Sequence, residues 1–184
     1  MPPSATNIIQ YMKEHNINAY RLIFNQSCHS VAEAALAVNA SPEDFVKNIC
    51  FIDDSKSNDI DTNKNNNENN NNDKTANNNN ETNDTTNLIV AIIKGEDKAD
   101  ANKIASYLKI PKPKIATPEQ ILEKTGYPCG GTPSFGYKAT FLIDTRVMEK
   151  EFVYTGGGTQ TSLIKISTKE LLKANSGQIA EVRK

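Results

Sequence analysis

The sequence predicts an α/β (α+β) fold, in which a mixed, largely antiparallel sheet, curled or closed into a barrel, is surrounded by helices. Two observations lead to this prediction. Helix start signals alternate with many short strand-like runs, and several of these runs are joined by turns too short for a parallel crossover. In addition, residues 87–94 (NLIVAIIK) are apolar almost throughout, as expected of a central strand covered on both faces.

Capping residues and apolar spacing place the elements along the chain. The candidate helix caps are Ser, Thr or Asp residues, at Ser4 or Thr6, Ser30, Ser41, Asp100, Thr117 and Ser167. The expected elements are, in order, a helix ending near residues 15–16, a strand at 19–24, a helix at 31–38, a single turn after Ser41, a strand at 45–52, the central strand at 87–94, helices at 101–110 and 119–125, strands at 138–144, 151–155 and 162–166, a helix at 169–174 and a strand at 178–182. Helical spacing puts Ile104, Tyr107 and Leu108 on one apolar face.

Residues 55–87 interrupt this pattern. From Asn63 to Asn80, twelve of eighteen residues are asparagine. Such a segment cannot bury enough apolar surface to offset the entropy of ordering it. We therefore expect a disordered Asn-rich insertion within a single domain that spans residues 1–184. Its ends, near Asp53 and Asn87, should lie close together on adjacent antiparallel strands. An interaction or aggregation role of the asparagine tract is the alternative.

Composition limits the classes of function. The formal net charge is −1, with basic and acidic residues interspersed, so any contact with nucleic acid must be local. The three cysteines form no CxxC pair and are interpreted as free thiols in a reducing compartment. No signal peptide pattern and no apolar stretch of membrane-spanning length occurs, which predicts a cytoplasmic protein without a membrane partner.

A lysine lies on an apolar side of the expected strand at 45–52. Strand alternation places Lys47 on the same face as Ile49 and Phe51, and Asn48 on the opposite face. A cation in this position must be paired, extend its ammonium to the surface at the end of the strand, or be held for an anionic ligand, because burying it alone is costly. The residues alone favour the second of these alternatives.

Other motifs are weaker. The glycine-rich segments 126–136 and 156–158 can form anion-binding turns of consecutive N–H groups or serve as plain connections, and neither has a Walker or GxGxxG pattern. Cys28 and His29 are adjacent but lack an oxyanion motif, so a catalytic pair is not indicated. The scattered cysteines and histidines do not predict a zinc site.

Several segments together resemble the YbaK family of aminoacyl-tRNA deacylase domains, which stand alone or are attached to prolyl-tRNA synthetase. The matching segments are HSVAEAA at 29–35, FVKN at 45–48 running into ICFID, IVAIIKGEDKAD at 89–100, IATPEQILEKTGYPCGGTPSFG at 115–136, FLIDTRV at 141–147 and YTGGGTQTSLIKIS at 154–167. They cover nearly the whole chain except the Asn-rich insertion. When the family's Gly-x-x-x-Pro spacing is counted from Gly130, Ser134 stands where proline is expected.

This resemblance implies an editing hydrolase that deacylates mischarged tRNA, most simply Ala-tRNA(Pro) or Cys-tRNA(Pro), and that acts alone or as the N-terminal domain of a prolyl-tRNA synthetase. Its partners would be the 3′ aminoacyl-adenosine end of the tRNA and prolyl-tRNA synthetase in cis or in trans. No metal and no cofactor is implied. Lys47 inherits the essential catalytic role. The substrate-binding residues implied are His29, Asn48, Gly130, Gly131, Thr132, Pro133, Phe135, Gly136, Asp144, Gly157 and Gly158. The alternative is a non-catalytic tRNA- or synthetase-binding module with the same fold.

Overall fold

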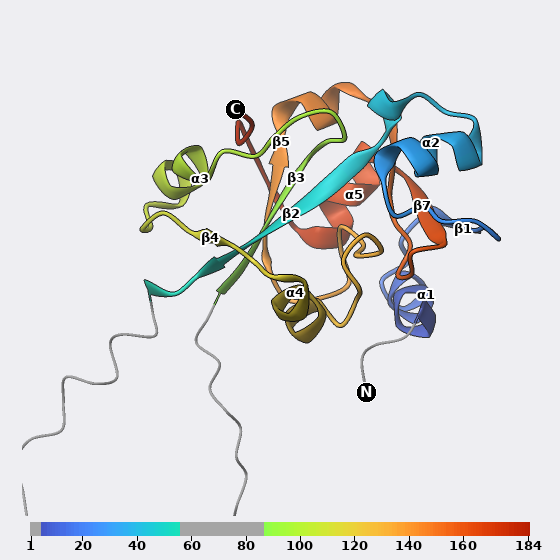
Figure 1. Ribbon diagram of the computed structural model, residues 1–184, viewed down its shortest axis with the longest axis horizontal. Helices are drawn as coiled ribbons and strands as arrows, with labels where there is room; N and C mark the ends of the chain where they lie inside the picture. Colours follow the sequence, from blue (N-terminus) through green and yellow to red (C-terminus); the bar gives the residue numbers. More distant parts are fainter. Residues whose placement is uncertain (1–4, 56–86) are drawn as a thin grey trace, which may run out of the picture.

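The computed structural model describes residues 5–55 and 87–184, which form two sheets with helices packed around them (Figure 1). The expected cap at Ser4 and the Asn-rich insertion, apart from its first and last residues, lie outside the described residues. The helices are α1 (Ala5–Glu14), α2 (Val31–Val38), α3 (Ala101–Leu108), α4 (Pro118–Thr125) and α5 (Thr168–Asn175), with short 3-10 turns η1 (Pro42–Asp44) and η3 (Thr145–Glu149). The strands are β1 (Ala19–Ile23), β2 (Val46–Asp53), β3 (Asn87–Lys94), β4 (Lys114–Ile115), β5 (Thr140–Asp144), β6 (Phe152–Gly156), β7 (Ser162–Ser167) and β8 (Gln178–Ala180).

The larger sheet has the strand order β4-β2-β3-β5-β8, with β3 at its centre. Strand β3 runs antiparallel to β2 and parallel to β5. Val90, Ala91 and Ile92 have no exposed surface, which confirms the prediction of a central strand covered on both faces. Asp53 pairs in register with Asn87. The two ends of the insertion are therefore side by side, as expected.

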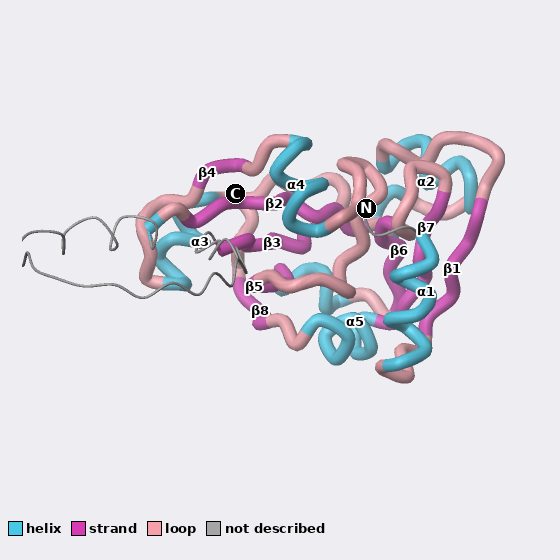
Figure 2. Tube along the Cα trace, turned by 90° about the horizontal axis from the view of Figure 1, so that it is seen from below, coloured by secondary structure: helices cyan, strands magenta, loops and turns pink. Residues whose placement is uncertain are grey.

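The smaller sheet has the order β1-β7-β6, and all its pairings are antiparallel. Figure 2 shows it beside the larger sheet, at the opposite end of the molecule from α3. Across both sheets only the β3–β5 and β5–β8 pairings are parallel, so the predicted mixed, largely antiparallel fold is confirmed. Within the described residues neither sheet closes into a barrel. An isolated bridge between Phe45 and Tyr154 links the start of β2 to β6, where the two sheets meet.

The helix caps explain where most helices begin. The Ser30 hydroxyl accepts a hydrogen bond from the Glu33 N–H, and the Glu33 carboxylate accepts one from the Ser30 N–H, which completes the expected capping box. Helix α4 ends at Gly126, whose φ of 74° lies in the left-handed region that favours glycine. The expected apolar face of α3 is only partly observed. Ile104 is fully buried, but Tyr107 is 45% exposed because it lies at the edge of the stripe that faces the sheet.

Candidate active site

Strand β2 separates two apolar clusters, as its alternation predicts. Cys50 and Ile52 on one face belong to the main core, whereas Ile49 and Phe51 on the other belong to a cluster that includes Ile104 of α3. The capped turn at Ser41 delivers the chain to this strand, so Lys47 is placed at the junction of the two sheets. The position of Lys47 thus follows from a rigid strand and not from a loop.

The Lys47 ammonium is partly buried and has no counter-ion in contact with it. It forms no ion pair or hydrogen bond with any residue in 5–55 or 87–184. Burial lowers its pKa below the ordinary lysine value; the nearby Asp97 carboxylate opposes this shift and Lys98 adds to it. A partly desolvated, unpaired cation on a rigid strand is suited to an anionic ligand.

A cavity of about 180 Å³ opens beside Lys47. It is lined by residues from α2 and the segment before it, from β2 and the residue before it, and from α4, the 126–136 loop, β6 and β7. These residues are Cys28, His29, Ser30, Val31, Ala34, Phe45, Val46, Lys47, Asn48, Cys50, Ile121, Cys129, Gly130, Thr132, Tyr154, Thr155, Gly156 and Leu163. Five of the expected site residues are therefore brought together around one space: His29, Lys47, Asn48, Gly130 and Thr132. The structure places a cation, an amide, an imidazole and a glycine turn within reach of one small ligand.

Asn48 joins β2 to the 126–136 loop. Its side-chain N–H donates to the Thr132 carbonyl at 2.8 Å, and its oxygen accepts from the Ser134 hydroxyl at 2.7 Å. Ser134 has no exposed surface and also shares a 2.7 Å hydrogen bond with the Thr155 hydroxyl. Neither Ser134 nor Thr155 was expected as a site residue. The one sequence signal at Ser134 is that it occupies the position where the Gly-x-x-x-Pro spacing, counted from Gly130, would have proline.

Replacing Ser134 by alanine should loosen this connection and lower the stability of the fold. The change removes the donor to Asn48 and leaves polar atoms of Asn48 and Thr155 without that partner in a buried site, which costs roughly 1–3 kcal/mol. Urea denaturation measures the loss. Ser106→Ala, on an exposed position of α3, is the matched control and should change stability by less than about 0.5 kcal/mol. Equal stability of the two variants would contradict the assigned hydrogen bonds.

The two glycine turns pack against each other without side chains between them. The Gly158 N–H donates to the Gly131 carbonyl at 2.8 Å, and a Cβ on Gly131 would overlap the backbone of Thr159. Gly130, with a φ of 81°, lies so close to His29 that a Cβ would overlap the imidazole ring. Glycine is therefore required sterically here, because any side chain would push the loop away from its neighbours.

Some backbone N–H groups of the two glycine turns donate hydrogen bonds within the protein, and others do not. The Gly131 N–H is already donated to the Pro128 carbonyl, and the Gly157 N–H to Ser162. By contrast, the N–H groups of Gly130 and Thr132, two residues that line the cavity, form no hydrogen bond with the described residues. These two groups are the candidates for binding a substrate carbonyl.

Several residues expected at the site do not line this cavity. Gly131, Pro133, Gly157 and Gly158 shape the loops behind it, Phe135 is fully buried in the main core, and Gly136 packs against Ile8 and Tyr11. The glycine that does reach the cavity from the second turn is Gly156. Gly156 directly precedes the expected Gly157 and Gly158, so the residue of this turn that lines the cavity lies one position earlier in the chain.

Asp144 also lies away from the cavity and serves a structural role. Its carboxylate is fully buried, pairs with the Arg183 guanidinium at 2.7 Å and accepts from the backbone N–H groups of Arg146 and Val182. Asp144 therefore fastens the end of β5 to the C-terminal segment and is not available to a substrate.

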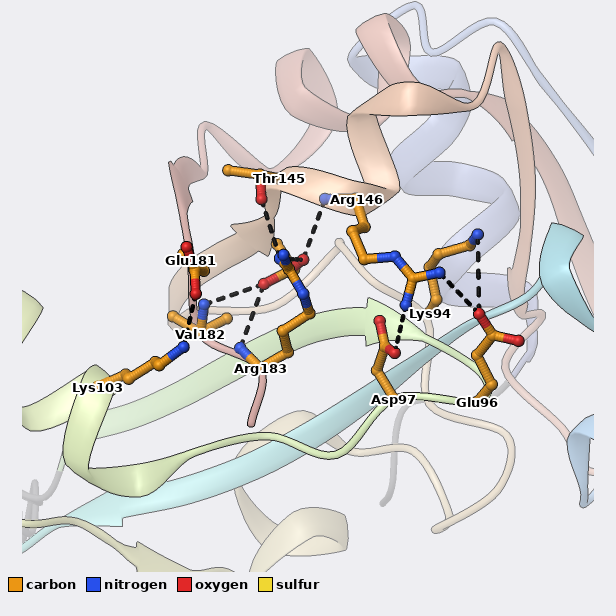
Figure 3. A network of polar contacts seen from close by, with 10 residues as sticks. Lys94, Glu96, Asp97, Lys103, Thr145, Arg146, Glu181, Val182 and Arg183 are labelled. Carbon is orange, nitrogen blue, oxygen red and sulfur yellow. Dashed lines mark hydrogen bonds and ion pairs between the residues drawn. The ribbon is translucent and has the colours of Figure 1, made fainter.

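Arg146, next to this anchor, holds the loop that follows β3. Figure 3 shows its guanidinium between Glu96, at 2.9 Å, and Asp97, at 2.6 Å, with the Lys94 ammonium 4.0 Å from the same Glu96 oxygen. The loop carries Asp97 and Lys98, the two charged groups that act on Lys47. The network thus fixes the electrostatic surroundings of Lys47 from outside the cavity.

All three cysteines line the cavity, although they are far apart in the sequence. Cys28 and Cys50 are buried, and Cys129 is exposed. Burial raises the pKa of Cys50 to about 12, so it stays a neutral thiol and a poor nucleophile at physiological pH. The thiols therefore form part of the wall of the cavity. In the part of the chain that the structure describes, no group of histidine, cysteine or acidic residues could hold a metal ion.

One comparison with known proteins identifies a family. A family model of the aminoacyl-tRNA editing domain matches residues 70–174, more than half of the chain. A search of curated proteins finds no significant match. Lys47, Asn48 and His29 precede the matched segment, so their roles depend on the geometry described above.

Solved structures give the same fold. A protein described as a candidate trans-editing enzyme for prolyl-tRNA synthetase has a TM-score of 0.75 at 21% identity, with 100% of this chain and 99% of that chain covered. A hypothetical protein has a TM-score of 0.75 at 21% identity, with 97% and 99% covered. No helix in the described ranges is long and apolar enough to cross a membrane.

Proposed function

The chain belongs to the family of aminoacyl-tRNA editing domains, and from this premise we propose that the cavity at Lys47 is where mischarged tRNA is deacylated. The observation that carries the proposal is the unpaired, partly buried Lys47 ammonium beside a glycine loop with two free N–H groups. We assign the activity to a single domain of residues 1–184. The partner is the 3′ aminoacyl-adenosine end of the tRNA.

The reaction needs positioning and charge stabilisation. Water attacks the ester carbonyl carbon, the bond to the ribose oxygen breaks, and that oxygen leaves with a proton. Negative charge develops on the carbonyl oxygen, and the N–H groups of Gly130 and Thr132 donate hydrogen bonds to that oxygen, as the donors of an oxyanion site do. Lys47 binds the negatively charged end of the tRNA, which orients the ester, and positioning of this kind supplies a large share of a rate enhancement.

The walls of the cavity favour a small amino acid. Val31, Ile121 and Leu163 are apolar residues in the wall of this cavity, whose volume is about 180 Å³. A small pocket excludes a bulkier amino acid, which is the basis of editing by size. We propose alanine or cysteine attached to proline tRNA as the substrate, with prolyl-tRNA synthetase as the source of the mischarged tRNA, in cis or in trans. The similarity to a protein described as a candidate trans-editing enzyme for that synthetase supports this choice.

A panel of charged tRNAs tests the substrate. Proline tRNA carrying alanine, cysteine or proline is incubated with the protein, and release of each amino acid is followed. Alanine or cysteine should be released at least roughly 10–200 times faster than proline, because one extra methylene group in a fitted pocket already allows that discrimination and proline has two more carbon atoms than alanine. Release of all three amino acids at one rate would contradict a size-selective pocket.

A further inference from the structure

A second and larger cavity, of about 780 Å³, also borders Lys47. Its charged lining residues are five lysines and one acid, namely Lys47, Lys98, Lys112, Lys114, Lys184 and Asp100. The formal net charge of the whole chain is −1, so this surface, which we call the lysine groove, is strongly positive within a nearly neutral molecule. A local basic surface is the form of nucleic-acid contact that the composition still permits.

The fold gathers these lysines from separate elements. Lys47 lies on β2, Lys98 in the loop before α3, Lys112 between α3 and β4, Lys114 on β4, and Lys184 follows β8. The Lys184 N–H donates to the Lys98 carbonyl at 2.8 Å, which fixes the C-terminal residue at the groove. Such spacing along the chain gives no charge run in the sequence, although the side chains share one surface.

Most of this charge is not neutralised by the protein itself. Lys98, Lys112 and Lys184 form no ion pair with the described residues. Lys114 pairs with Asp54 at 3.0 Å, but both side chains are at least half exposed, and such pairs contribute little. The Asp100 carboxylate is occupied as the cap of α3, where it accepts from Asn102 and Lys103.

Apolar residues also line the groove, beside Asn102. Ile115 is 72% exposed and Ile49 is half-buried, whereas Phe51 and Pro113 are buried. Single-stranded nucleic acid is bound by surfaces that combine a positively charged groove for the backbone with side chains against which the bases pack. The lysine groove supplies the positive charge, and Ile115 with the half-buried Ile49 supplies a small apolar surface. Lys47 borders both the groove and the smaller cavity, so a strand lying in the groove would bring its end to the proposed active site.

We propose that the lysine groove binds the single-stranded 3′ end of the tRNA, with its phosphates on the lysines and a base against the exposed Ile115. This inference rests on the proposed function, since it supplies the path by which the aminoacyl end reaches the smaller cavity. Charge complementarity favours a phosphate backbone over an uncharged partner.

The test is the binding of a short single-stranded RNA that ends in CCA and carries no amino acid. Lys98→Gln/Lys112→Gln removes two groove charges without breaking an ion pair, and Lys138→Gln/Lys169→Gln removes two exposed charges elsewhere. The groove variant should raise the Kd at least tenfold and should lower the slope of log Kd against log salt by about 1.4, the value for two phosphate contacts on a single strand. The control variant should bind as the wild type does.

Three outcomes would overturn the inference: no RNA binding by the wild-type protein, equal weakening by both double variants, or equal competition by a polyglutamate peptide, which would indicate an acidic protein partner. Thermal unfolding of both variants shows that they are folded. The RNA in this assay carries no amino acid, so the assay measures binding alone. A negative result is therefore distinct from a failure of the proposed deacylation. If the protein deacylates mischarged tRNA but binds RNA equally well without the groove lysines, only the proposed role of the groove is refuted. If it binds RNA through the groove but does not deacylate, only the proposed activity is refuted.

Discussion

Replacing Lys47 by methionine is expected to abolish deacylation of mischarged tRNA. Methionine keeps most of the length of the side chain and removes the charge. The cavity then loses the one cation that lines it among the described residues, and no other lysine or arginine borders it. The change thus removes the group that orients the tRNA end, whereas the apolar walls and the glycine loop remain. Amino acid release by the variant should fall to the spontaneous rate.

The same substitution should leave the fold as stable as the wild type or more stable. Burial lowers the pKa of Lys47, so the folded state binds this proton less tightly than the unfolded chain does. The charge of Lys47 therefore destabilises the folded state at every pH below the lowered pKa. This destabilisation decreases as the pH rises from the lowered pKa to the ordinary lysine pKa, because the unfolded chain then loses the proton as well. Urea denaturation at neutral pH measures the difference.

Lys138→Met is the control, because Lys138 is exposed and lines neither cavity. It should retain full activity. Wild-type activity of the Lys47 variant would refute the assignment of Lys47. Loss of both activity and stability would show instead that Lys47 supports the fold.

Replacing Gly156 by alanine is expected to damage both the fold and the activity. A Cβ at this position would overlap the Thr132 carbonyl, a backbone group that cannot rotate away as a side chain could. That carbonyl accepts the hydrogen bond from Asn48, so the 126–136 loop must move and release β2. Overpacking of this kind costs about 1–3 kcal/mol.

The Gly156 variant should therefore lose most of its deacylation activity even at temperatures where it remains folded, because the free N–H groups of Gly130 and Thr132 move with the loop. Circular dichroism identifies the folded range, and amino acid release is measured within it. Unchanged activity and stability would mean that the two glycine turns are not in the close contact described here.

Local patterns in the sequence predicted most of the fold. The alternation of β2, the apolar run of β3 and the capping box at Ser30 each depend on residues that are neighbours in the chain, and all three are observed. The prediction was weaker where an element is short. Tyr107 is exposed because α3 covers the sheet with a narrow stripe.

The site was predicted less completely, because its details depend on contacts between distant segments. Alternation alone marked Lys47 as unusual, and the glycine segments indicated the loops around it. The sequence neighbours of Asp144 do not show whether its carboxylate faces a ligand or, as in the structure, pairs with Arg183. Likewise, the contact of Ser134 with Asn48 joins residues that are 86 positions apart. The lysine groove is a further case, since its lysines come together only in the folded chain.

The most direct test of the account is a single-turnover measurement with protein in excess over mischarged proline tRNA, at a concentration that binds all of the RNA. The predicted result is release of alanine or cysteine well above the spontaneous rate by the wild-type protein, and release at the spontaneous rate by Lys47→Met. If the wild-type protein binds the tRNA fully and the amino acid stays attached, the domain is a binding module and the account is contradicted.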